Sequence, residues 1–563
     1  MSILVGEYLF RRLKQLGVGT VFGVPGDYEL ALLDLPSKEG LEWIGTPNEL
    51  VGAYAADGYA RYKGFGALVT TFGPGELSAL CGIGGAFCEF VPVVHIVGYP
   101  TTASQKSGHI LHHTLGDGSY DHYIKMSSEL SCATAVLKNA ATATAEIDRV
   151  LTAMLTYSQP GYIGISEDIA YSSVPAAGLD VPLHRALQAP NDADAETAVV
   201  TEIVAKVEAA KRPVIIFDGG AGRRDWAGFA DPLVEAAGLP FFVTTLGKGV
   251  VTETSPLFGG AYCGIGSPAS VIEAVEAADC ILWLGNLPSD FNTGMFSENV
   301  KTPNIVDFQR FTVTVGQAQY ATKMVQVLPK LIEAIKGSTI LIGRRASAAA
   351  PARTPHPVPE TDILTQDYLW PRLSGFLQPG DLVVTETGTS QVGFLSTDLP
   401  AQSTVWTQAV YGSIGYAAGA AVGASVAAKA TGEYKRMVLV TGEGSLQLTV
   451  QAFSILARHG LPCVVFVLNN KGYTVERYFH GFDSLYNDVP LWDYGALFKA
   501  FAPNVTGVQT YKVGTTAELN KLLDDETLSN EAVPKLFDIE LAYGDAPYLL
   551  RGLFEPKAKA IEK

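Results

Sequence analysis

The sequence predicts an α/β protein of three domains, each a mostly parallel sheet flanked by helices. Its length is the first observation: 563 residues, at roughly 150 residues per domain, predict about three or four domains. The second is a repeated alternation of short apolar runs rich in β-branched residues with helical patterns, which is typical of parallel sheets covered by helices. The third is composition: 47% hydrophobic and 17% charged residues favour a large buried core over disorder.

The apolar runs that we expect to form strands fall into three blocks. The runs lie at 20–23, 67–71, 91–97 and 161–165, then at 212–220, 240–244, 280–286 and 304–308, and finally at 381–386, 436–441, 462–469 and 534–541. A Pro-, Ala- and Asp-rich stretch around 174–200 separates the first two blocks, and a stretch rich in Pro and Ala at 343–362 predicts an exposed, extended connector before the third. The predicted domains are therefore 1–180, 190–345 and 363–563, with 343–362 as the linker.

The charge balance narrows the class of partner. There are 57 acidic and 40 basic residues, a net charge of −17, which argues against nucleic acid or an anionic membrane as the main partner. No apolar run is long enough to cross a membrane, and the six cysteines form no C-x-x-C motif. We expect buried free thiols and a cytoplasmic protein.

The third block contains a candidate site for phosphate and metal. Residues 438–456 predict a strand, a glycine turn and a helix that begins near Ser445, and the free N–H groups of a helix N-terminus attract anions. Glu443 lies between two glycines of this turn, and Asn469 and Asn470 follow the next strand. Because the carboxyl ends of parallel strands share one edge, we expect these oxygens to meet and hold Mg²⁺. Either turn alone would more often be ordinary loop structure.

A glycine–acid–glycine turn followed about two dozen residues later by paired asparagines resembles the fingerprint of enzymes that use thiamine diphosphate. The family usually has Asp where this chain has Glu443. The wider resemblance is to the fungal and bacterial pyruvate decarboxylases, and it is carried by strings that run almost from end to end. The strings are TVFGVPGDYELALLD (20–34), NELVGAYAADGYAR (48–61), GELSAL (75–80), LHHTLGDG (111–118), SDFNTG (289–294), ETGTS (386–390), YGSIGY (411–416), GSLQLTVQ (444–451) and LNNKGYTVER (468–477).

The resemblance implies a fold with an N-terminal pyrimidine-binding domain, a middle domain and a C-terminal diphosphate-binding domain, the two outer ones sharing the thiamine diphosphate-binding fold. It also implies that Glu49 hydrogen-bonds the aminopyrimidine ring of the cofactor. Local sequence alone would favour Glu49 as a helix-start glutamate. Asp27, His112, His113 and Glu476 would be the remaining catalytic residues, which exchange protons with the substrate.

Other residues acquire binding roles by the same resemblance. Metal binding would fall to Glu443, Asn470 and Gly472. Cofactor binding would fall to Glu49, Thr387, Thr389, Gly412, Ile414, Gly444, Ser445, Asn470 and Thr474. Phe291, Gln391 and Val475 would border the substrate, and Gln391 departs from the small residue that many relatives carry.

The histidine cluster has a competing interpretation. His109, His112 and His113 contain an H-x-x-H pattern that occurs in metal sites. Neighbouring sequence supplies no Cys or carboxylate that completes such a site, so proton transfer is the favoured role.

The resemblance implies an enzyme that decarboxylates pyruvate to acetaldehyde and CO₂ through a thiamine diphosphate ylid and enamine, with thiamine diphosphate and Mg²⁺ as cofactors. The substrate would be a small-molecule 2-oxo acid. The partner would be a second copy of the chain, in a homodimer with a composite active site and further in a homotetramer. A decarboxylase of larger 2-oxo acids (phenylpyruvate, indolepyruvate or branched-chain) is the alternative. A carboligase that uses thiamine diphosphate and FAD, or a non-enzymatic binding protein, is less favoured.

Overall fold

A computed structural model describes residues 2–183, 186–345, 349–350, 352–353, 357–432, 434, 436–530 and 532–561. The described residues form two compact units, which are considered separately below. The first lies within Met1–Ala186, Ala418–Gly432 and Thr449–Leu461, and the second within Leu187–Ala417, Glu433–Leu448 and Pro462–Lys563. The domain boundaries expected from sequence stay a prediction.

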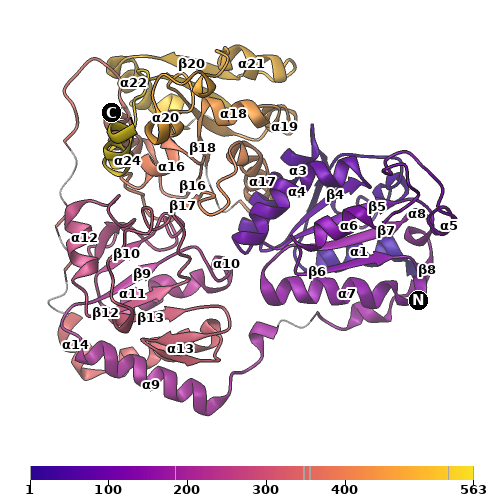
Figure 1. Cartoon of the computed structure of the whole chain (residues 1–563), viewed down its shortest axis with the longest axis horizontal. Coiled ribbons are helices and arrows are strands. Elements are labelled where there is room, and N and C mark those ends of the chain that lie inside the picture. Colours follow the sequence, from indigo (N-terminus) through magenta and orange to yellow (C-terminus); the bar gives the residue numbers. More distant parts are fainter. Residues whose placement is uncertain are drawn as a thin grey trace. The chain divides into compact units, whose positions relative to one another are not determined.

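The first unit is built on a parallel six-stranded sheet (Figure 1). Its order is β3 (Glu42–Gly45), β2 (Thr20–Gly23), β4 (Gly66–Thr71), β5 (Val93–Tyr99), β7 (Gly161–Ser166) and β6 (Ala133–Leu137). The four strands predicted in this block are confirmed. The edge strands β3 and β6 were not predicted, because each is short and only partly buried and therefore lacks a continuous apolar run.

Helices cover both faces of this sheet. On one face α1 (Val5–Gln15) and α7 (Ala140–Tyr157) pack with the strands into one apolar core. On the other face α3 (Glu49–Lys63) and α4 (Pro74–Cys88) pack against each other and against β4. The distant helix α17 (Tyr416–Thr431) packs on α3 through small residues, since a Cβ on Gly423 would lie 1.7 Å from the Ala55 carbonyl oxygen. A short antiparallel pair, β1 (Ser2–Leu4) and β8 (Ser173–Pro175), completes the unit.

The core of this sheet contains a histidine that must stay neutral. His95 on β5 is 1% exposed, and burial lowers its pKa to about 3. Its Nε2 lies 2.9 Å from the Thr70 hydroxyl, and its Nδ1 has no hydrogen-bond partner among the described residues. An unfolded chain binds a proton here near pH 6.5 and the folded chain does not, so His95 removes stability as the pH falls from about 6.5 towards 3.

We expect His95→Gln to reduce the acid sensitivity of folding. The amide can still contact Thr70 but takes up no proton, so the variant should lose less stability between pH 7 and pH 5 than the parent. The difference should be about 2 kcal/mol, from about 1.4 kcal/mol per pH unit below 6.5. Urea unfolding at both pH values measures it, with the half-buried His122→Gln as control. Equal pH dependence in parent and His95→Gln would contradict the prediction.

The second unit contains two sheets. The first is mixed and seven-stranded, in the order β11 (Phe258–Ala261), β10 (Phe241–Val243), β9 (Pro213–Phe217), β12 (Cys280–Leu284), β13 (Ile305–Phe308), β14 (Val313–Val315) and β15 (Ala318–Tyr320). Its last two strands run antiparallel to their neighbours. The helices α9 (Ala193–Ala209), α11 (Ala230–Ala237) and α13 (Met324–Gly337) pack with this sheet into one core, and α12 (Ala269–Glu276) packs with it into a second. The predicted mostly parallel sheet is confirmed, with β14 and β15 as an antiparallel addition.

The other sheet of this unit is parallel and six-stranded (Figure 1). Its order is β17 (Thr404–Trp406), β16 (Asp381–Thr385), β18 (Arg436–Gly442), β19 (Cys463–Asn469), β21 (Lys535–Glu540) and β20 (Gln509–Val513). Its helices include α15 (Gln366–Phe376), α16 (Thr389–Phe394), α18 (Glu443–Thr449), α20 (Thr474–His480), α21 (Tyr494–Phe501), α22 (Thr516–Leu523) and α24 (Tyr548–Ile561). All the strands predicted for both sheets are present.

Three local expectations need correction. The helix expected near Ser445 begins at Glu443 and ends at Thr449, and a separate helix, α19, covers Ala452–Arg458. The predicted connector 343–362 begins inside α14 (Thr339–Arg345). Its described residues 349–350, 352–353 and 357–362 form no helix or strand, and 346–348, 351 and 354–356 lie outside the described residues. The stretch 174–200, expected to be a linker, already enters α9 at Ala193.

The cysteines are free, as expected, but they are not all buried. Cys263, Cys280 and Cys463 are buried, two others are half-buried, and Cys81 is exposed. Among the described residues, no helix has both the length and the apolar character needed to cross a lipid bilayer.

Candidate active site

The predicted site residues of the first unit follow the carboxyl ends of its strands. Glu49 opens α3, just after β3, and is half-buried. Asn48 caps this helix, because its side-chain oxygen accepts a hydrogen bond from the Val51 N–H at 2.8 Å. Gly75 in α4 leaves room beside the carboxylate, since a Cβ there would lie 3.2 Å from Glu49 Oε1. Strand ends are the usual ligand edge of such sheets.

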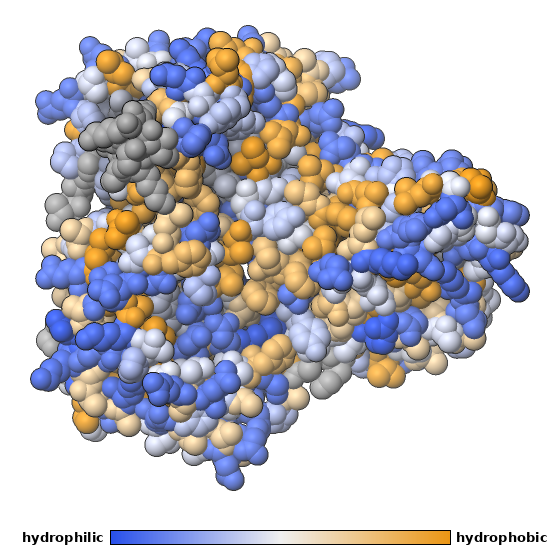
Figure 2. All heavy atoms as spheres, in the orientation of Figure 1, coloured by the Kyte–Doolittle hydropathy of each residue, from blue (hydrophilic) through white to orange (hydrophobic). Residues whose placement is uncertain are grey.

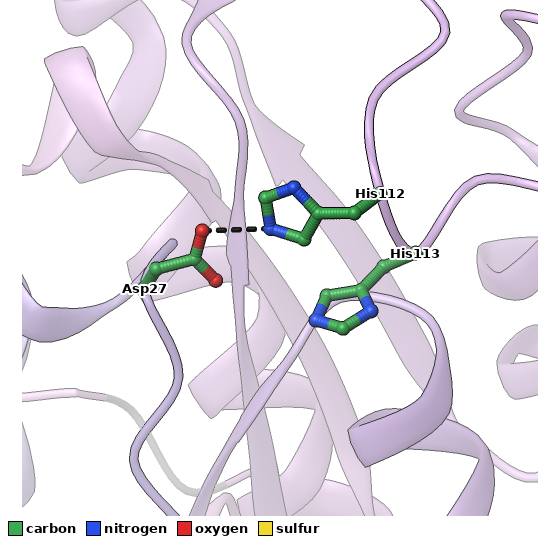
Figure 3. A group of neighbouring side chains, drawn as sticks. All are labelled: Asp27, His112 and His113. Atoms are coloured by element: carbon green, nitrogen blue, oxygen red, sulfur yellow. Dashed lines mark hydrogen bonds and ion pairs between the residues drawn. The ribbon is translucent and has the colours of Figure 1, made fainter.

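Asp27, His112 and His113 come together at this edge (Figure 3). His112 Nε2 lies 2.7 Å from Asp27 Oδ2, and the two side chains are 56% and 53% exposed. The Tyr28 ring stacks on His112 with ring centroids 4.8 Å apart. The His113 ring meets His112 edge-on, at 4.7 Å, and burial, followed by the nearby His112, lowers the His113 pKa. The two imidazoles therefore have different partners and orientations.

The Asp27 and Glu49 segments are linked through Thr71, the last residue of β4. A Cβ on Gly26 would lie 2.5 Å from the Thr71 Cβ, and a Cβ on Gly75 would lie 3.0 Å from the Thr71 methyl carbon. The absence of side chains at these two glycines lets both segments approach one strand end. The sheet therefore brings Glu49 and the Asp27–histidine cluster to the same edge.

Two buried acids beside this cluster were missed by the sequence analysis. Glu76 accepts hydrogen bonds from the Gly73 N–H at 2.9 Å and the Tyr162 hydroxyl at 2.8 Å, and burial raises its pKa to about 7. Glu29 is fully buried, neither of its oxygens has a hydrogen-bond partner in the described part of the chain, and burial raises its pKa to about 8. The available signal was an acidic residue in an otherwise apolar or glycine-rich stretch.

In the second unit, Glu443 lies at the carboxyl end of β18 and begins α18. Its side chain is buried, and this burial raises its pKa to about 7. Its Oε1 accepts a hydrogen bond of 2.6 Å from the Gly472 N–H, so the two predicted metal-site segments do meet. Gly472 has φ of +131°, and a Cβ there would lie 2.2 Å from the Asn487 carbonyl oxygen. Glycine is therefore required at this position.

The residues around Glu443 fit a divalent cation with oxygen ligands. Asn470 is buried, and its amide N–H points to the Asp545 carbonyl at 3.4 Å, which leaves its side-chain oxygen for another partner. A buried carboxylate without a positive partner costs free energy, and the raised pKa of Glu443 reflects this cost. A cation bound by Glu443, Asn470 and the Gly472 carbonyl would remove it. Carboxylate, amide and carbonyl oxygens are the ligands that Mg²⁺ prefers.

Neighbouring polar atoms fit a phosphate-bearing ligand. Thr474 Oγ1 and Asn469 Oδ1 are buried and have no hydrogen-bond partner in the described residues. Ser445 is buried in the first turn of α18. Gly444 allows close packing, since a Cβ there would lie 2.7 Å from the Tyr473 ring. Buried polar groups are rarely left unpaired, so these atoms favour a polar ligand that the chain itself does not supply.

The ETGTS and YGSIGY segments, quoted above at 386–390 and 411–416, are joined by a third buried acid that was also missed. Glu386 accepts hydrogen bonds from the backbone N–H groups of Gly415 and Ala417, both at 3.2 Å, and burial raises its pKa to about 8. It thereby fixes the loop that carries Gly412 (φ of +61°) and Ile414. Its position directly after a buried strand, at the ligand edge, was the available signal.

The other predicted residues of this unit lie as follows. The Thr387 hydroxyl donates to the Gln408 carbonyl at 2.9 Å, and Thr389 is buried at the start of α16. Glu476 is exposed in the first turn of α20. Phe291 and Gln391 line one small cavity. Val475 does not line it and packs instead beside an apolar cluster that contains Tyr478 and Leu550.

Comparison with known proteins places this geometry in a family. Three models of thiamine pyrophosphate enzymes match the chain; thiamine pyrophosphate is another name for thiamine diphosphate. The N-terminal thiamine pyrophosphate-binding domain matches residues 3–123, the central domain 200–336, and the C-terminal thiamine pyrophosphate-binding domain 386–539. A solved structure from Mycobacterium smegmatis, described as that of a "putative thiamin diphosphate-dependent enzyme", has a TM-score of 0.73 at 21% identity, covering 96% of this chain and 99% of that one. That likeness shows the fold.

Curated relatives narrow the family. Pyruvate decarboxylase isozyme 1 of Saccharomyces cerevisiae is 43% identical over 550 residues, which cover 97% of each protein. Pyruvate decarboxylase of Candida glabrata is 44% identical over 555 residues, which cover 97% of this chain and 96% of that protein. With both thiamine diphosphate-binding domains and the central domain present, the chain belongs to the thiamine diphosphate-dependent pyruvate decarboxylase family.

Proposed function

We propose that this enzyme decarboxylates pyruvate to acetaldehyde and CO₂, without oxidation, using thiamine diphosphate and Mg²⁺. The observation that carries the proposal is the 43–44% identity to pyruvate decarboxylases over almost the whole chain. The two clusters described above supply what the reaction needs, namely proton-exchanging groups in the first unit and a cation and phosphate site in the second.

The roles of the chain's own residues follow from their positions. Glu443, Asn470 and the Gly472 carbonyl hold Mg²⁺. The remaining cofactor contacts are those expected from sequence: Glu49, Thr387, Thr389, Gly412, Ile414, Gly444, Ser445, Asn470 and Thr474. When bound, thiamine diphosphate supplies the electron sink for the electrons released as CO₂ leaves.

Proton transfer is the task of the remaining groups. Glu49 would be the residue that meets the cofactor ring and shares a proton with it, and its half-buried position allows it to reach a ligand while limiting its contact with water. Asp27, His112 and His113 exchange protons with the substrate; the 2.7 Å contact between His112 and Asp27 holds a carboxylate beside the imidazole. Glu476 is the fourth proton-exchanging group.

We further propose that the active site is composite. Glu49 of one subunit would face Glu443 of another in a homodimer, dimers would pair into a homotetramer, and an isolated monomer would be inactive. Large apolar side chains at the surface support such contacts: Leu485 is 83% exposed, Leu491 72% and Ile110 70%. Figure 2 shows orange apolar side chains among blue hydrophilic ones on the face in view. Free cysteines support a cytoplasmic location.

A coupled alcohol dehydrogenase assay on a panel of 2-oxo acids tests the function. We expect the highest kcat/KM with pyruvate, and no aldehyde after thiamine diphosphate and Mg²⁺ are removed. A higher kcat/KM with phenylpyruvate, indolepyruvate or a branched-chain acid would establish the alternative instead. Flavin absorbance in the purified protein, with acetolactate as product, would show that the protein is a carboligase and would contradict both decarboxylase assignments.

Gln391 provides a test of substrate size. It is buried, and its amide N–H groups donate to the Thr407 hydroxyl at 2.7 Å and the Gln408 carbonyl at 3.2 Å. Shortening it enlarges the cavity that it shares with Phe291. We expect Gln391→Ala to raise kcat/KM for phenylpyruvate relative to pyruvate by about 10-fold or more, since an added methylene in an apolar pocket is worth about 1–3 kcal/mol. Gln378→Ala, at a glutamine that does not line this cavity, is the control. If the ratio of kcat/KM for phenylpyruvate to that for pyruvate does not change, Gln391 does not border the substrate.

A further inference from the structure

We propose that Asp27, His112 and His113 also form an inhibitory binding site for a transition-metal dication of the Zn²⁺ class. One carboxylate and two imidazoles each offer a ligand atom, and these atoms all lie within 4.8 Å of one another. Figure 3 shows the Asp27 carboxylate and the two rings converging on a shared space. The inhibition rests on the proposed catalytic role of the three residues, whereas the binding itself does not.

The ligand set selects the class of metal. Imidazole suits Zn²⁺, Co²⁺, Ni²⁺ and Cu²⁺, whereas Mg²⁺ takes oxygen ligands. Zinc bonds to nitrogen and oxygen are ~2.0–2.2 Å, so small side-chain movements suffice to close the three ligand atoms on one ion. Since Asp27 and His112 are more than half exposed, a hydrated ion can reach them and retain water as a further ligand.

Surrounding contacts hold the His112 imidazole and the His113 backbone in place. The Tyr28 ring stacks on His112, and its hydroxyl lies 3.3 Å from His112 Nδ1, which leaves Nε2 directed at Asp27. His113 has a φ of +70°, and its carbonyl accepts a hydrogen bond of 2.8 Å from the Tyr123 hydroxyl. The Tyr28 contact with the second ring nitrogen is of the kind that fixes the tautomer and orientation of a metal-binding histidine, here His112.

The structure also changes the metal-site interpretation of the H-x-x-H pattern. In the described residues, the third ligand is Asp27, which lies 85 positions from His112 in the sequence, and His109 is not part of the cluster. A metal here would occupy the lone pairs that exchange protons with the substrate. The enzyme would therefore lose activity while keeping its thiamine diphosphate and Mg²⁺.

Cobalt titration of the holoenzyme tests the binding. With thiamine diphosphate and excess Mg²⁺ present to occupy the oxygen site, Co²⁺ should give the visible absorption of a nitrogen-ligated, low-symmetry ion, and Zn²⁺ should displace it. We expect Asp27→Asn, His112→Gln and His113→Gln each to weaken Co²⁺ binding by at least about 10-fold, the lower end of the loss seen when even outer contacts of a metal site are removed. Circular dichroism confirms that the variants are folded.

Two matched controls complete the design. His109→Gln removes the first histidine of the H-x-x-H pattern, and His122→Gln removes another histidine, a half-buried one that pairs with Asp117 at 2.7 Å. Both should keep the Co²⁺ band and the inhibition of the holoenzyme by Zn²⁺, which a chelator should reverse. Binding that survives all three ligand variants, or that is lost in either control, would overturn the proposal. So would full activity with Zn²⁺ bound.

Discussion

Glu49→Gln should lower the rate of aldehyde release by about 10²–10⁴-fold, the usual contribution of a positioned proton-transfer group. The substitution keeps the size of the side chain and its place at the head of α3, where Asn48 caps the helix. It removes only the ability to share a proton with the cofactor ring. The loss should therefore appear in kcat at saturating pyruvate, thiamine diphosphate and Mg²⁺, measured with coupled alcohol dehydrogenase.

Two controls separate this effect from misfolding and from cofactor loss. Glu42→Gln changes an exposed glutamate on the neighbouring strand β3 and should leave kcat unchanged. Quenching of tryptophan fluorescence by added thiamine diphosphate should show that Glu49→Gln still binds the cofactor. A Glu49→Gln enzyme that binds cofactor and turns over within a few-fold of the parent would remove Glu49 from the mechanism.

Features that depend on local patterns could be predicted from sequence. Several of the predicted strands are long, apolar runs that lie inside the sheets, such as β5 and β19, and apolar runs of this kind mark strands buried on both faces. Among the missed strands, β3, β6, β17 and β20 lie at sheet edges, where partly exposed residues break the pattern. The meeting of Glu443 with Gly472 was also predictable, because both follow neighbouring parallel strands.

Features that depend on long-range contacts could not be predicted. The pairing of Asp27 with His112 joins two loops that no local pattern connects, and it supplies from a distant segment the carboxylate that the sequence next to the histidines does not provide for a metal site. The sequence signals for the buried acids Glu29, Glu76 and Glu386 do not by themselves distinguish them from surface glutamates. Only the surrounding fold shows which of their oxygens are paired and which are not.

Glu443→Gln should lower activity at fixed Mg²⁺ by at least about 100-fold, because the variant leaves a neutral amide where a buried carboxylate would bind the cation. Losing one partner of a buried charged pair costs about 3–5 kcal/mol. We expect the Mg²⁺ concentration for half-maximal activity to rise accordingly. Glu333→Gln, in an exposed position of α13, is the control and should behave as the parent.

Glu443→Asp tests the length of this side chain. The family usually has Asp here, but in this chain the hydrogen bond from the Gly472 N–H reaches a glutamate oxygen at 2.6 Å. An aspartate is one methylene shorter and keeps the charge, so its Mg²⁺ requirement should lie between those of the parent and Glu443→Gln. If Glu443→Asp needs as much Mg²⁺ as Glu443→Gln does, the loop can place a metal-binding oxygen only on a side chain of glutamate length.

The pH dependence of Mg²⁺ activation follows from the same burial. Without metal, burial raises the Glu443 pKa to about 7, and a metal ligand must be deprotonated, so a proton competes with Mg²⁺ below that pH. The Mg²⁺ concentration for half-maximal activity should rise by up to about 10-fold for each pH unit below 7 and should change little above it. Glu443→Gln cannot bind this proton, so its Mg²⁺ concentration for half-maximal activity should no longer depend on pH below 7. A requirement for Mg²⁺ that is equal at pH 6 and pH 7.5 in the parent would show that another group binds the cation.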